Sequence, residues 1–460
     1  MSSVRNISGK LNQPLQYMSS SKSFVVNGKK YKSKQGWTRI SIYGTAYQRG
    51  FAHGFLLHKE LQTVEYMFPF LVKHDFNISY KRYLDDCSRL IVPIICREYP
   101  EIYHELQGIV AGYAAQGHTM DLIVLIAWNS MLSMFTHYSP ASRAERCSAF
   151  IACGNATEKG DIVMAHNSHS NYVIARVTNI ILQIKPEKGH MITMQCCPGY
   201  IASGTDWFIT SKGIMGCETT IGGFLKSPNF KKGTPYFCRI RQAMQYADSL
   251  DEYASIMTTK NAGDYPCGWM FGDIYRKEIM LCELGLEYTH VEKKKDGIFY
   301  GMNSATNELI RKKETNDRTY WDTSETSGAR NVRLHVLLYE TYMSKLNIEN
   351  AKKILSDHHD VFLDTNTDGT SRTICKHSEK DRKDKTQKDP RPFGAIDGKV
   401  INSAMAKKMS FYGIFGSSCG QSFSASSFRR SHRTKRQRKK YHQMTRHLRD
   451  LPSRKWIILQ

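Results

Sequence analysis

The chain has 460 residues, of which 41% are apolar and 23% are charged, so it can bury a substantial core and disorder is not its expected state. Its longest apolar runs, Leu90 to Cys96 and Leu122 to Trp128, have seven residues each, whereas a membrane-spanning helix needs about 20. The N-terminus lacks the apolar core of a secretory signal. We therefore expect no transmembrane helix and a cytoplasmic setting.

The formal net charge of +23 on its own indicates a nucleic acid or another anionic partner. Ten of these charges come from the segment Arg429 to Arg449, which contains no acids, and the remainder of the chain carries +13. The segment has one aromatic residue, Tyr441, so phosphate contact fits it better than base stacking. We expect contact with a polyanion or an anionic membrane through this basic tail, and no specific nucleic acid.

The first third of the chain is predicted to be helical. Residues 1–36 are polar and lack clear periodicity, which predicts a loose lead-in. Apolar residues then recur at three- and four-residue spacing, which predicts a helical layer within residues 37–146, with helices in Phe51 to Phe70, Tyr83 to Ile95, Ile102 to Ala115 and Leu122 to Phe135. The glycines of the block Gly44 to Gly54 predict close backbone approach at a helix start.

The pattern changes from helical to strand-like at Cys147. Three hairpins are predicted, each with a polar turn: Cys147 to Cys153 with Ile162 to His166, Val177 to Ile184 with Met191 to Cys196, and Trp207 to Thr210 with Ile214 to Thr220. Together they predict an antiparallel meander that begins at a cysteine.

Later segments repeat the alternation of helical and extended patterns. Helices are predicted over Thr234 to Met257, Ala329 to Met343 and Ile348 to about His358, and strands over Gly268 to Asn303. Runs of strands between runs of helices favour an α+β fold in which two antiparallel sheets pack together under helices. We place the core at residues 147–423 and treat residues 424–460 as a basic C-terminal tail separate from it.

Signatures of nucleotide and metal binding are absent: the sequence has no GxxxxGK[ST], no strand-borne GxGxxG, no HExxH and no CxxC pair. His166 and His169 are three positions apart on a predicted strand, so their side chains point to opposite faces and suit chelation poorly. We expect no metal and no cofactor. The twelve scattered cysteines are expected to be mostly reduced and buried.

Cys147 is the candidate for chemistry, because it opens the first strand after a helical region and a polar loop. Position alone favours a buried structural thiol, since a reactive cysteine needs exposure and a lowered pKa. A papain-like thiol protease would require Cys147 at a helix N-terminus and a distant histidine such as His290 or His335. The strand pattern after Cys147 argues against that class.

Several blocks, in order, carry a family resemblance over about Gly44 to Phe423. They are Gly44 to Gly54, Cys147-Ser148-Ala149-Phe150, Ala165-His166-Asn167-Ser168-His169, Ser203 to Phe208, Glu218 to Ile221, Asn261 to Tyr265, and Trp269. This series resembles the phospholipase B-like family and the related acyl-coenzyme A:isopenicillin N acyltransferase family, peptidase C45. The resemblance implies the four-layer αββα sandwich of N-terminal-nucleophile (Ntn) hydrolases and a precursor that cuts itself between Arg146 and Cys147.

The resemblance also implies roles for individual residues. Cys147 would be the nucleophile and its freed α-amine the base, since an α-amine has a pKa of about 7.7–8.0. Asn303 would donate to the oxyanion, with a turn asparagine as the equal alternative. His166 would be a further catalytic residue. Expected substrate-binding residues are Asn167, His169, Asp206, Thr219, Thr220 and Arg330.

Some of these expectations have plainer alternatives. A β-branched pair such as Thr219 and Thr220 more often packs than binds, and the pattern around Arg330 favours a surface arginine at a helix start. His169 stands where phospholipase B-like proteins have Trp and many wider relatives have Asp, which leaves the substrate preference open.

The leading hypothesis is a self-processed thiol amidase or acyltransferase acting on a linear non-peptide amide. The second hypothesis is that the same mechanism hydrolyses the acyl esters of phospholipids. A non-catalytic protein that keeps the fold and binds polyanions through its basic tail is the alternative from another class.

Overall fold

The computed structural model describes residues 25–142, 146–381, 390–431, 444 and 446–460. The larger of its two main sheets has nine strands in the order β1-β2-β5-β6-β7-β8-β9-β10-β11. They span Gly28–Lys30 (β1), Thr38–Gly44 (β2), Ile180–Pro186 (β5), Ile192–Cys196 (β6), Trp207–Thr210 (β7), Ile214–Thr220 (β8), Cys267–Asp273 (β9), Glu278–Leu284 (β10) and Thr289–Lys294 (β11). All neighbours are antiparallel except β2 and β5, which pair in parallel, so this sheet is mixed rather than wholly antiparallel as predicted.

The smaller main sheet has six antiparallel strands in the order β12-β3-β4-β15-β16-β17. They span Gly297–Gly301 (β12), Cys147–Gly154 (β3), Gly160–Asn171 (β4), Phe393–Asn402 (β15), Phe411–Phe415 (β16) and Ile457–Leu459 (β17). Strand β3 packs on β8, β9 and β10 of the larger sheet. Ile151 and Ile162 reach Gly272 there so closely that a Cβ on the glycine would lie 3.0 and 3.3 Å from their methyl groups. The two sheets therefore stack directly against one another.

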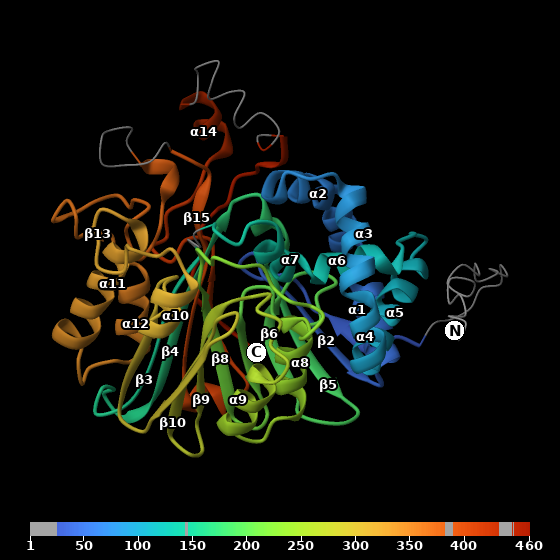
Figure 1. Ribbon diagram of the computed structural model, residues 1–460, viewed down its shortest axis with the longest axis horizontal. Coiled ribbons are helices and arrows are strands. Elements are labelled where there is room, and N and C mark those ends of the chain that lie inside the picture. The colour runs from blue at the N-terminus through green and yellow to red at the C-terminus, as the bar shows by residue number, and fades with distance from the viewer. Residues whose placement is uncertain (1–24, 143–145, 382–389, 432–443, 445) are drawn as a thin grey trace.

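Helices cover the outer faces of both sheets (Figure 1). Helices α8 (Tyr236–Tyr246) and α9 (Leu250–Thr258) pack on the larger sheet. Helix α12 (Ile348–Leu355) packs on β4 and β15 of the smaller sheet, beside α11 (Thr326–His335) and a π-helical turn, Val336–Thr341. This arrangement confirms the predicted α+β sandwich.

Shorter elements complete this part of the chain: α10 (Glu308–Glu314), α13 (Ser403–Ala406), α14 (Ala425–Ser431), the 3-10 helices Ile174–Val177 and Ser378–Lys380, and the two-stranded ladder β13 (His359–Asp360) with β14 (Thr365–Asn366).

The predicted N-terminal helical layer is present as seven helices among the described residues. They are α1 (Ala46–Leu56), α2 (His58–Phe76), α3 (Tyr80–Leu90), α4 (Val92–Glu98), α5 (Pro100–Ala114), α6 (Leu122–Asn129) and α7 (Met131–Tyr138). They gather at one side of the sandwich, drawn blue to teal in Figure 1. Within the described part of the chain, every helix is too short or too polar to cross a bilayer.

The three predicted hairpins all form, but they do not make one meander. The first, β3 with β4, belongs to the smaller sheet, whereas β5 to β8 belong to the larger sheet. Strand β12 also leaves the run β9 to β11 and pairs with β3. The chain thus crosses between the sheets more than once. The sequence could not predict these crossings, because strands buried on both faces carry no periodic signal for the sheet they join.

Residues from the predicted lead-in and from the predicted tail both join the main sheets. The expected loose lead-in contributes β1, which pairs with β2. The expected separate tail contributes β17, which pairs with β16, and its Leu448 and Leu451 are buried in the core. In both segments, apolar residues between the charged ones pack against the body of the protein. Most of the basic segment, residues 432–443, lies outside the described residues.

Glycines let helices α1 and α5 touch along their backbones, as the Gly44 to Gly54 block predicts. A Cβ on Gly50 would lie 2.1 Å from the Glu105 carbonyl oxygen, and one on Gly54 would lie 1.9 Å from that of Ile109. Gly108 and Gly112 approach α1 in the same way from α5. Helix α1 starts at Thr45 in a capping box with Gln48. These residues set the spacing of the helical layer.

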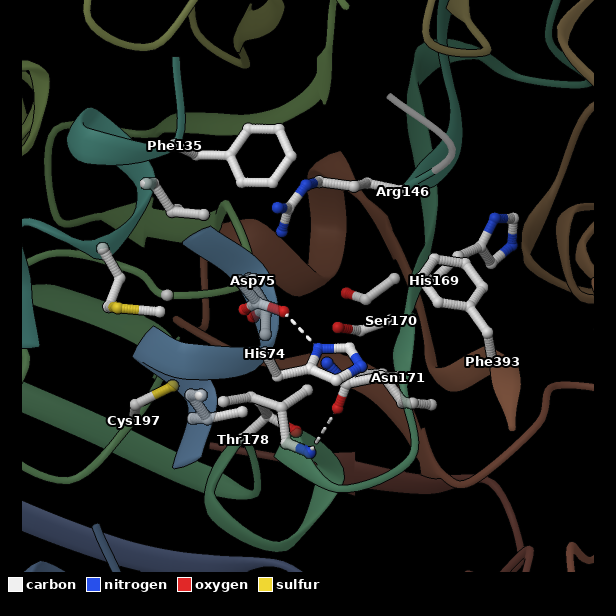
Figure 2. A pocket seen from close by; sticks show the side chains of 18 of the residues that line it. His74, Asp75, Phe135, Arg146, His169, Ser170, Asn171, Thr178, Cys197 and Phe393 are labelled. Carbon is white, nitrogen blue, oxygen red and sulfur yellow. Dashed lines mark hydrogen bonds and ion pairs between the residues drawn. The ribbon is translucent and has the colours of Figure 1, made fainter. Parts of the chain in front are cut away.

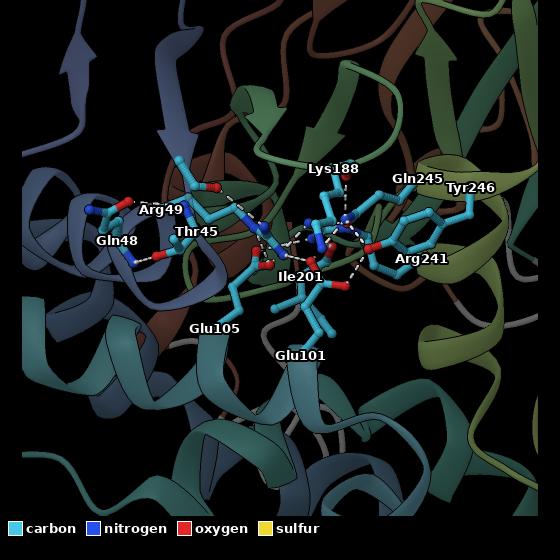
Figure 3. Close-up of polar contacts among 11 residues, drawn as sticks. Thr45, Gln48, Arg49, Glu101, Glu105, Lys188, Ile201, Arg241, Gln245 and Tyr246 are labelled. Atoms are coloured by element: carbon cyan, nitrogen blue, oxygen red, sulfur yellow. Dashed lines mark hydrogen bonds and ion pairs between the residues drawn. The ribbon is translucent and has the colours of Figure 1, made fainter.

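A buried ion cluster joins this helix pair to α8 (Figure 3). Glu105 of α5 accepts from Arg49 Nε at 2.6 Å and from both terminal nitrogens of Arg241 at 3.0 Å. Burial alone would raise the pKa of Glu105, but the charges of Arg241 and Arg49 hold it below its usual value. Arg241 also donates to the Ile201 carbonyl at 2.7 Å. One carboxylate therefore serves two buried guanidinium groups.

Replacing Glu105 by Gln is expected to lower the free energy of unfolding by about 3–5 kcal/mol, because two buried arginines lose their shared counter-charge. The matched control is Glu98→Gln, since Glu98 pairs at the surface with Lys260 and should cost at most about 1 kcal/mol. Urea titration followed by tryptophan fluorescence measures both. Equal losses in the two variants would contradict a dominant role for the cluster.

Candidate functional site

Cys147 begins β3 between the two sheets, where only 6% of the residue is exposed. In the β3–β4 ladder it stands opposite Ser168. The carbonyl oxygen of Arg146, the residue before it, accepts a hydrogen bond from the backbone N–H of His169. The peptide bond predicted to be cut is therefore held in place by the strand pairing with β4.

Asn303 contacts the backbone nitrogen of Cys147. It follows β12 in a left-handed conformation, φ 80°, and its Oδ1 accepts from Cys147 N at 3.1 Å and from Arg330 Nη2 at 2.9 Å. Its Nδ2 donates to the Thr220 carbonyl at 2.9 Å. Because the Asn303 amide group is already hydrogen-bonded on both sides, this geometry fits a residue that orients the Cys147 nitrogen better than the predicted oxyanion donor.

Arg330 is fully buried on α11, which corrects the expectation of a surface arginine. Its Nη1 donates to the Cys147 carbonyl and, at 3.0 Å, to Ser148 Oγ. Its Nη2 donates to the Met302 carbonyl at 2.9 Å. The planar guanidinium group thus joins the start of β3 to the end of β12.

Two buried carboxyl groups, Asp206 and Glu218, lie beside the cysteine. Tyr265 Oη is 3.0 Å from Asp206 Oδ2 and 2.8 Å from Glu218 Oε1. Burial raises the pKa of Glu218 well above its usual value, and the neighbouring Asp206 raises it further. Burial also raises the pKa of Asp206. The pair therefore retains a proton at pH values where an exposed carboxyl group would be ionised.

Burial and the nearby charged groups determine whether the Cys147 thiol is protonated. Burial raises the pKa of Cys147 well above its usual value, Glu218 and Asp206 raise it further, and Lys399 acts in the opposite direction. Lys399 is fully buried, pairs with Asp397 at 2.7 Å and donates to Ser168 Oγ at 2.8 Å. The Cys147 thiol is thus held in its neutral form.

The two histidines of β4 point to opposite faces, as their spacing predicts. His166 Nε2 lies 3.0 Å from the Glu218 carbonyl and His169 Nε2 lies 3.1 Å from the Ile374 carbonyl. Burial lowers the pKa of both rings well below the usual value, so both are neutral near neutral pH. Asn167 shares the face of His169 and donates to the Leu355 carbonyl at 2.7 Å, so the structure places it in packing and away from Cys147.

The two threonines also differ. Thr220 Oγ1 lies 2.8 Å from Tyr265 Oη and joins the carboxyl pair. Thr219 packs against β12, where a Cβ on Gly301 would lie 2.2 Å from its Oγ1. Thr219 therefore has the packing role that the pattern favours.

The histidines considered for a papain-like site lie on other elements. His290 is on β11, with Nε2 at 3.7 Å from Glu292, and His335 ends α11 with its ring 4.9 Å from that of Tyr339. Cys147 begins a strand, which also disagrees with a papain-like arrangement.

A pocket of about 740 Å³ opens beside Cys147. Its wall combines apolar side chains, among them Phe76, Trp128, Leu132, Phe135 and Phe393, with Asp206, His169 and Arg146. Figure 2 shows the Arg146 side chain crossing the pocket toward Phe135, and its guanidinium carbon lies 4.7 Å from that ring centre. The pocket has the size of a small-molecule site, and the side chain of Arg146, the residue before Cys147, occupies part of it.

Sequence reasoning missed Glu218, Tyr265, Lys399 and Asp397. Glu218 and Tyr265 lie within blocks that carry the family resemblance, so the sequence could have drawn attention to them. The sequence alone, however, does not show that Glu218 lies next to Asp206. Among the described residues, the side chains that could hold a metal lie elsewhere, at His358, Cys375, His377 and Cys419.

A comparison with protein-family models agrees with the phospholipase B part of the predicted resemblance. The phospholipase B family model matches residues 99–300, which include Cys147 and end before Asn303. Two solved structures of conjugated bile acid hydrolase from Clostridium perfringens, each a single-residue variant, are similar at 10% identity. One aligns over 58% of this chain and 88% of its own with a TM-score of 0.33, and the other over 59% and 82% with a TM-score of 0.27. No curated protein matches the sequence.

Replacing Arg330 by Met is expected to slow chemistry at Cys147 by about 10²-fold, because it removes the hydrogen bonds that fix the start of β3 and small misplacements cost that much. The readout is the predicted cleavage between Arg146 and Cys147, followed by intact mass over time. Arg333→Met is the matched control, since Arg333 lies one turn along α11 and pairs with Asp357. Identical cleavage rates in the two variants would rule out the positioning role.

Proposed function

We propose that this chain, which is phospholipase B-like over residues 99–300, is a thiol hydrolase of the N-terminal-nucleophile type that first cuts itself before Cys147. One observation carries the proposal. The Arg146–Cys147 peptide lies at a strand start, with its carbonyl oxygen bonded to His169 N–H and its nitrogen bonded to Asn303 Oδ1, at the edge of a substrate-sized pocket. The family match supports hydrolysis as the reaction class.

Self-cleavage would begin with attack of the Cys147 sulfur on the Arg146 carbonyl carbon. The His169 N–H already donates to the oxygen on which negative charge develops, as an oxyanion stabiliser must. The carbon–nitrogen bond then breaks, and the Cys147 nitrogen takes up the proton that the thiol gave up. Water hydrolyses the resulting thioester, which leaves a carboxylate on Arg146 and a free thiol and α-amine on Cys147.

After cleavage the α-amine of Cys147 would act as the base for its own thiol. Such an amine has a pKa of about 7.7–8.0, so a useful fraction is neutral near neutral pH. A buried, neutral thiol needs a base of this kind. Asn303 Oδ1 would orient the amine, and Arg330 would hold Asn303 in place.

Release of Arg146 from its peptide bond would also clear the pocket. Its side chain crosses the pocket toward Phe135 (Figure 2), and cleavage frees the chain end that holds it there. The vacated volume is lined by apolar side chains with Asp206 near Cys147. We assign as substrate a linear non-peptide amide with an apolar acyl group, which the apolar wall would accommodate.

The second candidate is acyl-ester hydrolysis of a phospholipid, which the apolar wall and the family match favour. The chemistry at Cys147 would be the same, since both substrates form a thioester with the sulfur. Parallel assays with an N-acyl amide and a phospholipid of the same acyl chain distinguish the two.

Intact mass of the purified protein is expected to show two associated pieces of 146 and 314 residues, and Cys147→Ala to remain a single chain. The reason is that only the Cys147 thiol attacks the bond before it. Cys153→Ala, six residues along the same strand, is the control and should be cut normally. A full-length wild-type chain with turnover, or cleavage in Cys147→Ala, would disprove the mechanism.

Asn303→Gly is expected to lower turnover by about 10²-fold, the cost of a misplaced reacting group. Glycine accepts the positive φ of this position, so backbone strain does not confuse the result. Because Oδ1 favours the protonated amine, its loss should lower the amine pKa and move the acidic limb of the kcat/KM profile to lower pH. An unshifted profile would assign Asn303 to the turn alone.

A further inference from the structure

Four potential metal ligands converge on the outer side of the smaller sheet, remote in sequence from Cys147. They are His358, after α12, Cys375 and His377, before the short helix Ser378–Lys380, and Cys419, after β16. Their ligand atoms all lie within 4.8 Å of one another. Three separate segments of the chain thus supply two sulfurs and two ring nitrogens to one point.

The distances match those around a tetrahedral zinc ion. His377 Nε2 lies 3.5 Å from Cys375 Sγ and 3.4 Å from Cys419 Sγ. Sulfur and nitrogen atoms bound to zinc at about 2.3 and 2.1 Å, and separated by a tetrahedral angle, are about 3.6 Å apart. The side chains already stand at nearly the separation that a shared ion would impose.

The surroundings of the four residues resemble those of a built site. Glu379 accepts at Oε1 from His377 Nδ1 at 3.2 Å, the carboxylate contact that orients metal-bound histidines. Tyr172 in turn holds the other oxygen of Glu379 at 2.7 Å. The Gln421 N–H donates to Cys419 Sγ at 3.4 Å, and Ser418 Oγ lies 3.5 Å from Cys375 Sγ.

The fourth ligand position is also available. His358 Nε2 is buried and has no hydrogen-bond partner among the described residues. Its ring lies edge-on to that of His377, with centres 5.1 Å apart. A buried ring nitrogen without a partner is costly, and coordination would satisfy it.

We propose that His358, Cys375, His377 and Cys419 bind one structural zinc ion. Four protein ligands leave no open position, which is typical of structural rather than catalytic zinc. Binding would release the thiol protons of Cys375 and Cys419 to solvent. The ion would lock the segments around His358 and Cys419 together.

The zinc would also support the nucleophile's strand. Ser418 Oγ donates to Asn167 Oδ1 at 3.0 Å, and the carbonyl of Ile374, next to Cys375, contacts His169. Asn167 and His169 belong to β4, which pairs with β3 at Cys147. The cluster therefore braces the face of β4 opposite the larger sheet.

A disulfide between Cys375 and Cys419 is the rival explanation for the paired sulfurs. Both thiols are free in the structure, and a disulfide would explain neither His358 nor the Glu379 contact to His377. The two explanations make opposite predictions for metal content and for peptide mapping without reduction.

The test is metal analysis of the full chain expressed with zinc. The wild-type protein should carry one zinc per chain by plasma mass spectrometry, and exchange with Co²⁺ should give thiolate-to-cobalt charge-transfer absorption. Cys375→Ser, Cys419→Ser and His358→Ala should lower metal content at least tenfold. His359→Ala and Cys96→Ser are the controls, since His359 lies beside His358 but faces Asp364, and Cys96 is exposed.

Chelation gives a readout that does not depend on variants folding. Removing zinc from the wild-type protein should lower its Tm, and adding zinc back should restore it, because an ion bound only by the native state stabilises it. Absence of zinc together with no Co²⁺ absorption in the wild-type protein, full metal content in Cys375→Ser, or a Cys375–Cys419 disulfide on peptide mapping would each overturn the proposal.

Discussion

The register between β3 and β4 is the constraint on which the candidate site depends. Pairing of Cys147 with Ser168 places the cysteine at the first position of a strand buried between two sheets. A slip of one residue would turn every side chain of β3 to the other face. Arg330 resists such a slip, because it donates to the Cys147 carbonyl and to the Met302 carbonyl beyond β12. The start of β3 is therefore fixed by the β3–β4 pairing and by hydrogen bonds from the Arg330 side chain to backbone carbonyls.

Burial of Cys147 among ionisable side chains determines the protonation state of its thiol. Around Cys147 the sandwich encloses the carboxyl pair Asp206 and Glu218 and the ion pair of Lys399 with Asp397. The raised pKa of the Cys147 thiol keeps this group in its neutral form. In the proposed mechanism, cleavage before Cys147 would create a free α-amine on this residue, and that amine would be the nearest new base for the thiol.

Elements with their own periodicity could be predicted from sequence, and long-range pairings could not. The hairpin from Cys147 and the α1 glycines follow from local pattern, and the family resemblance added the position of the proposed cut. Arg330 was misjudged, since a helix start is usually at the surface and only the tertiary fold buries it. The split of the strands between two sheets was missed for the same reason. The apolar residues Leu448 and Leu451 are visible in the sequence of the basic tail. The high charge around them led to the prediction that the tail is separate from the core.

The two faces of β4 divide the molecule's polar chemistry. His166 and Ser168 face the larger sheet and Lys399, whereas Asn167 and His169 face the loops that bring Cys375 and Cys419 together. The sequence shows Cys375 and His377 as a Cys-x-His pair, but His358 lies 17 residues before this pair and Cys419 lies 42 residues after it, so short-range spacing rules do not reach them. His169 lies at the point where β4 meets those loops. Its ring contacts the Ile374 carbonyl while its backbone N–H holds the Arg146 carbonyl, so one residue connects the proposed zinc cluster to the bond that the chain is proposed to cut.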